Sequence, residues 1–312
     1  MQPALDLLTT RRFTTLTGAG VSTDSGIPDY RGPGAPVRNP MTYQEFVSGP
    51  PAQRRYWARS YLGWSRMRGA EPNHSHHALA RLSAMGRTPL VITQNVDGLH
   101  ERAGTRSVCA LHGRISDVVC LSCRDRTGRA ALQERMSRLN PGFAEEHAWA
   151  ASRPDGDVEL DATDGFGIPP CEQCGGVLKP DVVFFGENVP KDRVQRCYDT
   201  LESSEALLVV GSSLAVLSGF RFVRHAHKLG IPVVIVNRGA TRGDALATHK
   251  LDAGCAEVLG ALESAVRGGP VRSGDVAADR DQHSERGQHD AVAEQHQAPD
   301  PPVEVLQQGV AR

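Results

Sequence analysis

An aspartate, a tyrosine and an arginine stand side by side at residues 29–31, at the end of a segment that begins with two glycines. Gly18 and Gly20 follow a short run typical of a β-strand, and they would let backbone N–H groups approach a ligand closely, as a pyrophosphate requires. A phosphate-binding loop alone needs no carboxylate, aromatic ring and guanidinium beside it. We therefore interpret residues 18–31 as a loop that binds a nucleotide and encloses its reactive end.

This glycine segment departs from the GxGxxG fingerprint of dinucleotide-binding proteins, because Thr23 stands where the third glycine would be. No acidic residue clearly ends a second strand about twenty residues further on, as the fingerprint requires. The segment alone leaves dinucleotide binding open and disfavours a dehydrogenase that transfers hydride.

Two amides and a carboxylate, Gln94, Asn95 and Asp97, follow an apolar run at residues 90–93 that is typical of a buried strand. Side chains in this position can point into a crevice at the end of the strand, where they suit a carboxamide or the hydroxyls of a sugar. The plainer alternative is a turn in which Asn95 and Asp97 cap the following helix.

His112 ends a further expected strand, at residues 108–111, and Gly113 follows it. A lone histidine at a strand end is more often structural than catalytic. Because Asn95 and Asp97 are expected at the same edge of the sheet, His112 is also a candidate general base. Imidazole titrates near neutral pH and can take a proton from a hydroxyl group.

Four of the seven cysteines form two CxxC pairs, Cys120 with Cys123 and Cys171 with Cys174. Each pair can supply two thiolates from one tight turn, so the two pairs predict a tetrahedral, structural Zn²⁺ site with no open position for catalysis. The alternative is two redox CxxC motifs. We expect the other three cysteines to be ordinary buried residues, except that Cys255 follows the last strand near the expected nucleotide pocket.

The elements that must position these residues are strands that alternate with helices. Each strand ends in Gly, Ser, Asn or His, which predicts a doubly wound parallel sheet with its ligands at the carboxyl ends of the strands. The expected strands are residues 13–16, 90–93, 108–111, 182–185, 206–210 and 233–236. Helices are expected after the N-caps Thr42 and Asn73, and at about residues 53–67, 129–139, 190–203 and 216–229.

The composition divides the chain into segments. Residues 1–113 and 179–266 predict the catalytic domain, with a helical insertion at about residues 41–86. Residues 114–178 predict a small zinc-binding module. Beyond it, residues 267–312 are rich in Gln, Asp, Pro and Gly and lack aromatic residues, which predicts a disordered tail.

The net charge of −1 over 312 residues gives no support for nucleic-acid or anionic-membrane binding as the main activity. The first 17 residues contain neither a long apolar run nor a basic amphipathic leader, and they are needed for the first strand. We therefore expect a cytoplasmic, monomeric protein that binds neither a membrane nor nucleic acid.

Taken together, these motifs resemble the sirtuin family. The matching segments are GAGVSTDSGIPDYR at 18–31, TQNVDGLHERAG at 93–104, LHG at 111–113, both CxxC pairs, KPDVVFFGE at 179–187 and GSSLAV at 211–216. Within the family, the segments at residues 53–64, 132–143 and 154–160 resemble class II, the branch that contains the mitochondrial sirtuin four.

The resemblance implies a Rossmann-like domain and an NAD-consuming protein-lysine deacylase. In that mechanism the acyl-lysine oxygen attacks the nicotinamide ribose, nicotinamide leaves, and His112 then deprotonates a ribose hydroxyl. The products are free lysine and O-acyl-ADP-ribose. NAD is thus a co-substrate that is cleaved, which explains a nicotinamide cofactor in a loop without the dehydrogenase fingerprint.

The resemblance also implies the roles of single residues. His112 and Asn95 are the expected catalytic residues. The expected NAD-binding residues are Gly18, Ala19, Gly20, Asp29, Tyr30, Arg31, Gln94, Asn95, Val96, Asp97, Gly211, Ser212, Ser213, Asn237, Arg238, Gly239 and Cys255. Tyr30 stands where many members of the family have Phe. The residues expected to pair with the substrate peptide by β-augmentation are Val183, Phe184 and Gly186.

The acyl preference is less defined. Tyr56 and Arg59 have a Y-x-x-R spacing that binds a distal carboxylate in class II relatives which prefer acidic acyl groups. The likeness to sirtuin four points instead to weak deacetylation, to other acyl groups including lipoyl, or to ADP-ribosyl transfer. The plainer alternative places Arg59 on a solvated helix face. Mono-ADP-ribosyl transfer and NAD sensing with little turnover are the competing functions.

Overall fold

The computed structural model describes residues 1–29, 40–147, 160 and 163–268. The chain divides into two units, Met1–Gly268 and Gly269–Arg312, and the description below concerns the first. Tyr30, Arg31 and almost all of the expected tail lie outside the described residues.

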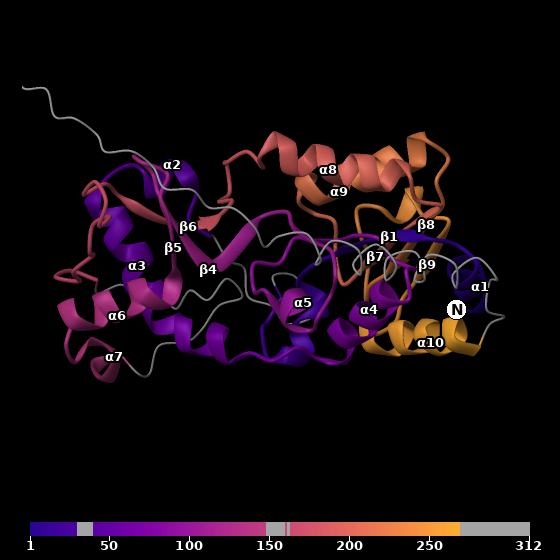
Figure 1. Ribbon diagram of the computed structural model, residues 1–312, viewed down its shortest axis with the longest axis horizontal. Coiled ribbons are helices and arrows are strands. Elements are labelled where there is room, and N and C mark those ends of the chain that lie inside the picture. The colour runs from indigo at the N-terminus through magenta and orange to yellow at the C-terminus, as the bar shows by residue number, and fades with distance from the viewer. Residues whose placement is uncertain (30–39, 148–159, 161–162, 269–312) are drawn as a thin grey trace, which may run out of the picture. The chain divides into compact units, whose positions relative to one another are not determined.

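Six parallel strands form the main sheet, in the order β3-β2-β1-β7-β8-β9 (Figure 1). Their bounds are Phe13–Thr17 (β1), Val91–Thr93 (β2), Val108–Ala110 (β3), Ala206–Val210 (β7), Val233–Val236 (β8) and His249–Leu251 (β9). Every residue of β1, β7 and β8 is buried. Such apolar runs without alternation are typical of strands covered on both faces. The prediction of a doubly wound parallel sheet is confirmed.

Helices cover both faces of this sheet. One face packs on α1 (Gln2–Thr9), α4 (His74–Ala84) and α10 (Cys255–Gly268), and the other on α8 (Lys191–Glu202) and α9 (Leu217–Lys228). Figure 1 shows α8 and α9 above the strands and α4 and α10 below them. The strand order reverses between β1 and β7, and at such a point a crevice opens beyond the carboxyl ends of the strands.

A second, antiparallel sheet has the order β5-β4-β6. Its strands are Gly113–Cys120 (β4), Arg126–Gly128 (β5) and Leu178–Val182 (β6). The strand expected at residues 182–185 is therefore misplaced, since it lies earlier and pairs with β4 rather than with the main sheet. An apolar run does not reveal which sheet it joins, but Pro180, which cannot donate a ladder hydrogen bond, fits the edge position that β6 occupies.

The remaining helices surround the second sheet and the crevice. They are α2 (Tyr43–Phe46), α3 (Pro50–Gly69), α5 (Leu99–Arg102), α6 (Arg129–Leu139) and α7 (Phe143–Glu146), with short 3₁₀ turns at Ala19–Val21, Thr23–Ser25 and Asp244–Leu246. Both expected N-caps are present. Thr42 accepts a hydrogen bond from the Glu45 N–H at 3.2 Å, and Asn73 accepts one from the Ser75 N–H at 2.9 Å. Among the described helices, none is long and apolar enough to cross a membrane.

Candidate active site

The loops that follow β1 and β7 pack against each other at the switch point of the sheet. The Gly20 N–H donates to the Gly211 carbonyl at 2.9 Å. Gly211 has φ +61°, and a Cβ on it would lie 2.5 Å from the Val21 nitrogen. A Cβ on Gly18 would lie 2.8 Å from the Gly211 oxygen. These glycines thus allow one loop to approach the other. From the sequence, we had expected them only to allow a ligand to approach.

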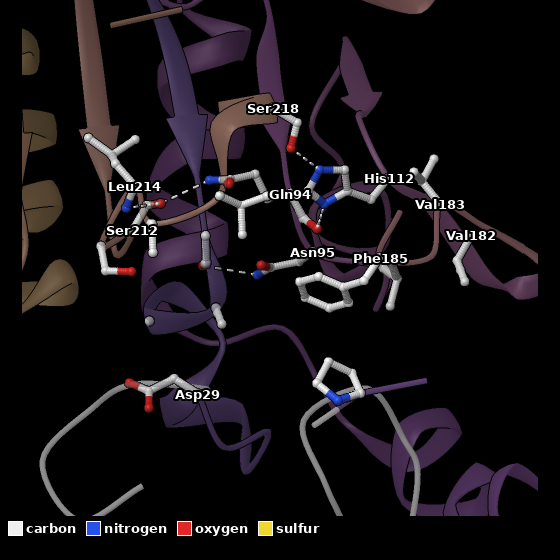
Figure 2. Close-up of a pocket in the computed structure, with 18 of the residues that line it drawn as sticks. Asp29, Gln94, Asn95, His112, Val182, Val183, Phe185, Ser212, Leu214 and Ser218 are labelled. Carbon is white, nitrogen blue, oxygen red and sulfur yellow. Dashed lines mark hydrogen bonds between the residues drawn. The ribbon is translucent and has the colours of Figure 1, made fainter. Parts of the chain in front are cut away.

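A cavity of about 840 Å³ opens at this point, a size typical of small-molecule and cofactor sites. Its wall is drawn in part in Figure 2. Most of the residues expected to bind NAD or substrate line it. They are Gly18, Ala19, Gly20, Asp29, Gln94, Asn95, Val96, Asp97, Gly211, Ser212, Ser213, Asn237, Arg238, Gly239, Tyr56, Val183, Phe184 and Gly186.

Asn95 and Asp97 are held by Ser22 of the glycine loop. The Asn95 amide donates to the Gly18 carbonyl at 3.1 Å and to Ser22 Oγ at 3.0 Å. Ser22 Oγ in turn donates to an Asp97 carboxylate oxygen at 2.7 Å. The other oxygen of Asp97 accepts from the backbone N–H of Leu99, the first residue of α5, at 2.9 Å. Asp97 therefore stabilises the turn into α5, whose N-cap is Gly98, while Asn95 bonds the nucleotide loop.

Gln94 joins the two nucleotide loops. Its side-chain amide donates to the Thr17 carbonyl at 3.3 Å and to Ser212 Oγ at 2.9 Å. Ser212 Oγ also accepts from the Leu214 N–H at 3.2 Å, so it organises the turn after β7. The backbone of Gln94 has a second task, because its carbonyl oxygen contacts the ring of His112.

Both ring nitrogens of His112 are hydrogen-bonded (Figure 2). Nδ1 lies 2.9 Å from the Gln94 carbonyl oxygen and Nε2 lies 2.7 Å from Ser218 Oγ. A carbonyl oxygen only accepts, so Nδ1 carries the hydrogen and Nε2 of the neutral ring keeps its lone pair. His112 lines the cavity, and this basic nitrogen is hydrogen-bonded to the Ser218 hydroxyl.

Burial lowers the pKa of His112, and the positive charges of Arg193 and Arg221 lower it further, while the bond to the Gln94 carbonyl partly raises it. Each of the lowering causes disfavours the imidazolium ion. His112 is consequently neutral near pH 7, the protonation state that a general base requires.

The backbone of His112 is tied to the second sheet. Its carbonyl accepts from the Val183 N–H at 2.8 Å, and the next residue, Gly113, pairs with Val182. Gly113 has φ +80°, and a Cβ on it would lie 1.9 Å from the Asp181 oxygen. Only glycine fits this close contact, which joins the histidine to the segment expected to pair with a peptide.

That segment, residues 183–187, is held by an ion pair between the buried Lys179 and the half-buried Glu187. Lys179 Nζ lies 3.0 Å from a Glu187 carboxylate oxygen, and the same carboxylate accepts from the Phe184 N–H at 3.0 Å. The ammonium also lies 4.6 Å from the centre of the Phe184 ring. Burial lowers the pKa of Lys179, and the nearby Glu187 opposes that shift.

Tyr56 and Arg59 differ in their position relative to the cavity. Tyr56 lines the cavity and packs on Phe46 and Phe184, with ring centres 5.5 Å and 5.2 Å away. Arg59 Nε donates to the Leu160 carbonyl at 2.8 Å, and Arg59 is not among the described residues that line the cavity. The structure brings the first residue of the Y-x-x-R pair to the cavity but not the second.

Cys255 lies behind the glycine loop, with Sγ 3.7 Å from the Gly20 carbonyl oxygen. Burial raises its pKa to about 11, so it is a neutral thiol. It does not belong to the described cavity wall. Its contact with the loop is therefore one of packing from the rear.

The four cysteines of the CxxC pairs form one cluster at the end of the second sheet. Their Sγ atoms all lie within 4.8 Å of one another, with 3.5 Å between Cys120 and Cys174 and 3.7 Å between Cys123 and Cys171. Zn–S bonds of about 2.3 Å in a tetrahedron place sulfurs about 3.8 Å apart. A Cβ on Gly176 would lie 2.9 Å from Cys120 Sγ, so the second turn is shaped around the thiols. The cluster fits a structural zinc ion.

Three polar residues of the site were missed from the sequence. Ser22 and Ser218 contact Asn95 and His112, and Arg221 lines the cavity near His112. Ser22 lies in the segment 18–31 on which the resemblance was based, but the sequence had suggested no role for it. Ser218 and Arg221 lie on the first turns of α9, where sequence indicates only a helix start.

Comparison with known proteins gives consistent matches. Residues 18–218 match the sequence pattern described as the Sir2 family. The chain is 53% identical over 259 residues to NAD-dependent protein deacetylase 1 of Mycobacterium avium (strain 104), covering 82% of this chain and 92% of that protein. It is 50% identical over 267 residues to the NAD-dependent protein deacetylase of Xanthomonas campestris pv. campestris (strain 8004), covering 84% and 90%.

Solved structures of Sir2 proteins are also similar to this chain. One is a Sir2 protein with a p53 peptide and NAD+, with a TM-score of 0.67 and 33% identity, covering 85% of this chain and 97% of that one. Another is a Sir2 protein bound to a propionylated peptide, with a TM-score of 0.65 and 31% identity, covering 85% and 97%.

Proposed function

This chain belongs to the Sir2 family, and we therefore propose that it is an NAD-dependent protein-lysine deacylase. The observation that carries the proposal is the state of His112, whose Nδ1 is bound to a carbonyl and whose Nε2 is left basic in a cavity bounded by two nucleotide-type loops. The relatives named above are NAD-dependent protein deacetylases.

We assign the loops after β1, β7 and β8 to NAD, together with Gln94, Asn95 and Asp97. The size of the cavity and the loop backbones beside it support this assignment. Bound NAD would supply an anomeric carbon activated by nicotinamide as leaving group. Asn95 would line the site of that ribose with a side chain already oriented by its bonds to Gly18 and Ser22, so little ordering remains at binding. The roles of Tyr30 and Arg31 in NAD binding stay predictions.

We assign proton removal to His112. Neutral imidazole at this position would take the proton of a ribose hydroxyl on Nε2, and the Gln94 carbonyl would stabilise the imidazolium through its bond to Nδ1. Asn95 is the second expected catalytic residue, acting by orientation rather than by proton transfer.

We assign residues 183–186 to the acyl-lysine polypeptide. The segment continues β6, an edge strand, and edge strands can accept an added strand. Phe185 and Leu217 line the cavity while being 42% and 62% exposed, an unusual exposure for large apolar side chains and one that suits a polypeptide partner.

For the acyl group we propose an uncharged chain rather than an acidic one. Met41, which packs in the same hydrophobic cluster as Tyr56, lines the cavity, and so do the apolar side chains of Met67 and Ile115. A panel of acetyl, succinyl, glutaryl-like, long-chain and lipoyl peptides read by mass spectrometry tests this. Faster cleavage of the acidic acyl groups, abolished in Arg59→Met, would restore the Y-x-x-R interpretation. The class II likeness also stays a prediction.

The division into a catalytic domain and a zinc-binding module is supported by the two separate sheets, and we retain it as a proposal with the monomeric state and cytoplasmic location. Size-exclusion chromatography with light scattering tests the first of these two, and cell fractionation the second.

The central test incubates the protein with NAD and an acetyl-lysine peptide. We expect nicotinamide release that depends on peptide, with deacetylated peptide and O-acetyl-ADP-ribose in equal amounts. Transfer of label from NAD to protein would instead indicate an ADP-ribosyltransferase. NAD binding without either product would indicate a sensor. Both results contradict the proposal.

A further inference from the structure

Ser218 contacts the basic nitrogen of His112, and the proton transfer assigned above makes no use of it. Ser218 lies in the first turn of α9 (Leu217–Lys228), 106 residues away in sequence, and it lines the same cavity. Its Oγ is 2.7 Å from His112 Nε2, a short hydrogen bond between neutral groups.

The direction of this hydrogen bond follows from the other side of the ring. Because Nδ1 must donate to the Gln94 carbonyl, Nε2 of the neutral imidazole can only accept. The Ser218 hydroxyl is therefore the donor, and it uses the single lone pair of the base. A substrate hydroxyl that approaches Nε2 meets Ser218 Oγ already in place.

The start of α9 is braced against the same strand end that holds the ring. Ser218 is followed by Gly219, and a Cβ on Gly219 would lie 2.4 Å from Gln94 Oε1. The side chain of Gln94 thus packs on α9 while its carbonyl binds His112 Nδ1. The residue that binds Nδ1 therefore packs against Gly219, the neighbour of the residue that binds Nε2, which helps to hold Ser218 Oγ in place relative to the ring.

We propose that Ser218 is a proton relay between the substrate hydroxyl and His112, an inference that rests on the proposed function. The substrate O–H bond breaks as a new O–H bond forms on Ser218 Oγ. In the same step the original Ser218 O–H bond breaks as Nε2–H forms. One proton leaves the substrate oxygen, one arrives on His112, and Ser218 ends as a neutral hydroxyl.

A hydroxyl suits both ends of this transfer. It donates to neutral imidazole before the step and accepts from the imidazolium N–H after it. Its oxygen has a second lone pair for the incoming substrate proton. No rotation of the histidine is needed, so the bond from Nδ1 to Gln94 is kept throughout.

The test compares Ser218→Ala, Ser218→Thr and wild type in single-turnover deacetylation of an acetyl-lysine peptide with NAD. We expect the rate to fall about tenfold or more in Ser218→Ala and to recover in large part in Ser218→Thr, which keeps the hydroxyl. Ser203→Ala is the matched control, since Ser203 is exposed directly after α8 and its hydroxyl donates to the Thr200 carbonyl, away from the cavity wall.

Two further readouts separate a relay from a structural role. Peptide-dependent exchange of labelled nicotinamide into NAD should be retained in Ser218→Ala, because nicotinamide departs before the base acts. The rate measured in mixtures of H₂O and D₂O should curve in wild type, where two protons move together, and become linear in Ser218→Ala.

The outcomes are distinguishable. A deacetylation rate in Ser218→Ala equal to or above wild type overturns the relay, because Ser218 would then only occupy a position that substrate takes over. Equal loss of exchange and deacetylation overturns it as well. Activity that survives in His112→Ala defeats the proposed base, and wild type without deacetylation defeats function and relay together.

Discussion

The two sheets of this chain are stabilised by different means. The main sheet buries every residue of its central strands between two layers of helices. The second sheet has three strands, and β5 is exposed at Arg126 and Gly128. The four cysteines form a cluster at one end of this sheet, and a metal ion bound there would stabilise a part of the chain that has only a small core. Burial thus stabilises the half with the main sheet, whereas zinc bound by the four cysteines would supplement burial in the smaller half.

The largest expected effect leaves both sheets intact. In His112→Ala we expect deacetylation to fall by about 100- to 10,000-fold, the usual contribution of a general base. Thermal unfolding should change little, because the backbone bond from Val183 to residue 112 is kept and the ring faces the cavity rather than the core. Rate assays and calorimetry on the same preparation check this. A variant with unchanged turnover would show that another group takes the proton.

Metal removal should break the smaller sheet alone. We expect Cys174→Ser, or treatment with a chelator, to raise hydrogen exchange in β4 and β6 while β1 and β7 stay protected. Activity should fall with it, since β6 leads into the segment beside His112. Exchange measured by mass spectrometry resolves the two sheets. Uniform protection without metal would contradict the structural role of the cluster.

Glycine replacement probes the packing of the nucleotide loops. Gly211→Ala combines left-handed strain with a contact of 2.5 Å, so we expect a loss of about 3 kcal/mol in unfolding free energy and weaker NAD binding. Gly26→Ala is the matched control, because Gly26 has φ +79° with no atom within 4 Å of the added Cβ. It should lose only about 1 kcal/mol. Equal losses in chemical denaturation would mean that the loop contact is unimportant.

The smallest effect concerns the pH profile. The positive charge of Arg221 lowers the pKa of His112, so its removal in Arg221→Gln should raise that pKa. A base with a raised pKa becomes protonated at higher pH, and the acid limb of the rate profile should shift upward in pH. Single-turnover rates against pH measure it. A shift toward lower pH would contradict the sign of the interaction.

Local signals in the sequence were sufficient for much of this structure. The apolar runs of β7 and β8 and the caps at Thr42 and Asn73 depend on neighbouring residues, and each was predicted where it occurs. β9 was not predicted, because its three residues, His249–Leu251, are half-buried and show no alternation.

Contacts between distant segments were not predictable in the same way. Gly18 and Gly20 were noticed only for their approach to a ligand, since their closeness to Gly211 is visible only once the strand order is known. Ser218 sits before a glycine at a helix start, where a serine is ordinary. Its bond to His112 depends on the packing of α9 against Gln94, which no local pattern encodes.

The position of His112 between the two sheets has a thermodynamic consequence. Its carbonyl binds Val183 on the peptide side and its ring binds Gln94 on the nucleotide side, so one residue is ordered by both halves of the cavity. A ligand that orders either half reduces the freedom that the other ligand must remove. We therefore expect the two affinities to be coupled, and the factor by which NAD increases the affinity for the peptide must then equal the factor by which the peptide increases the affinity for NAD.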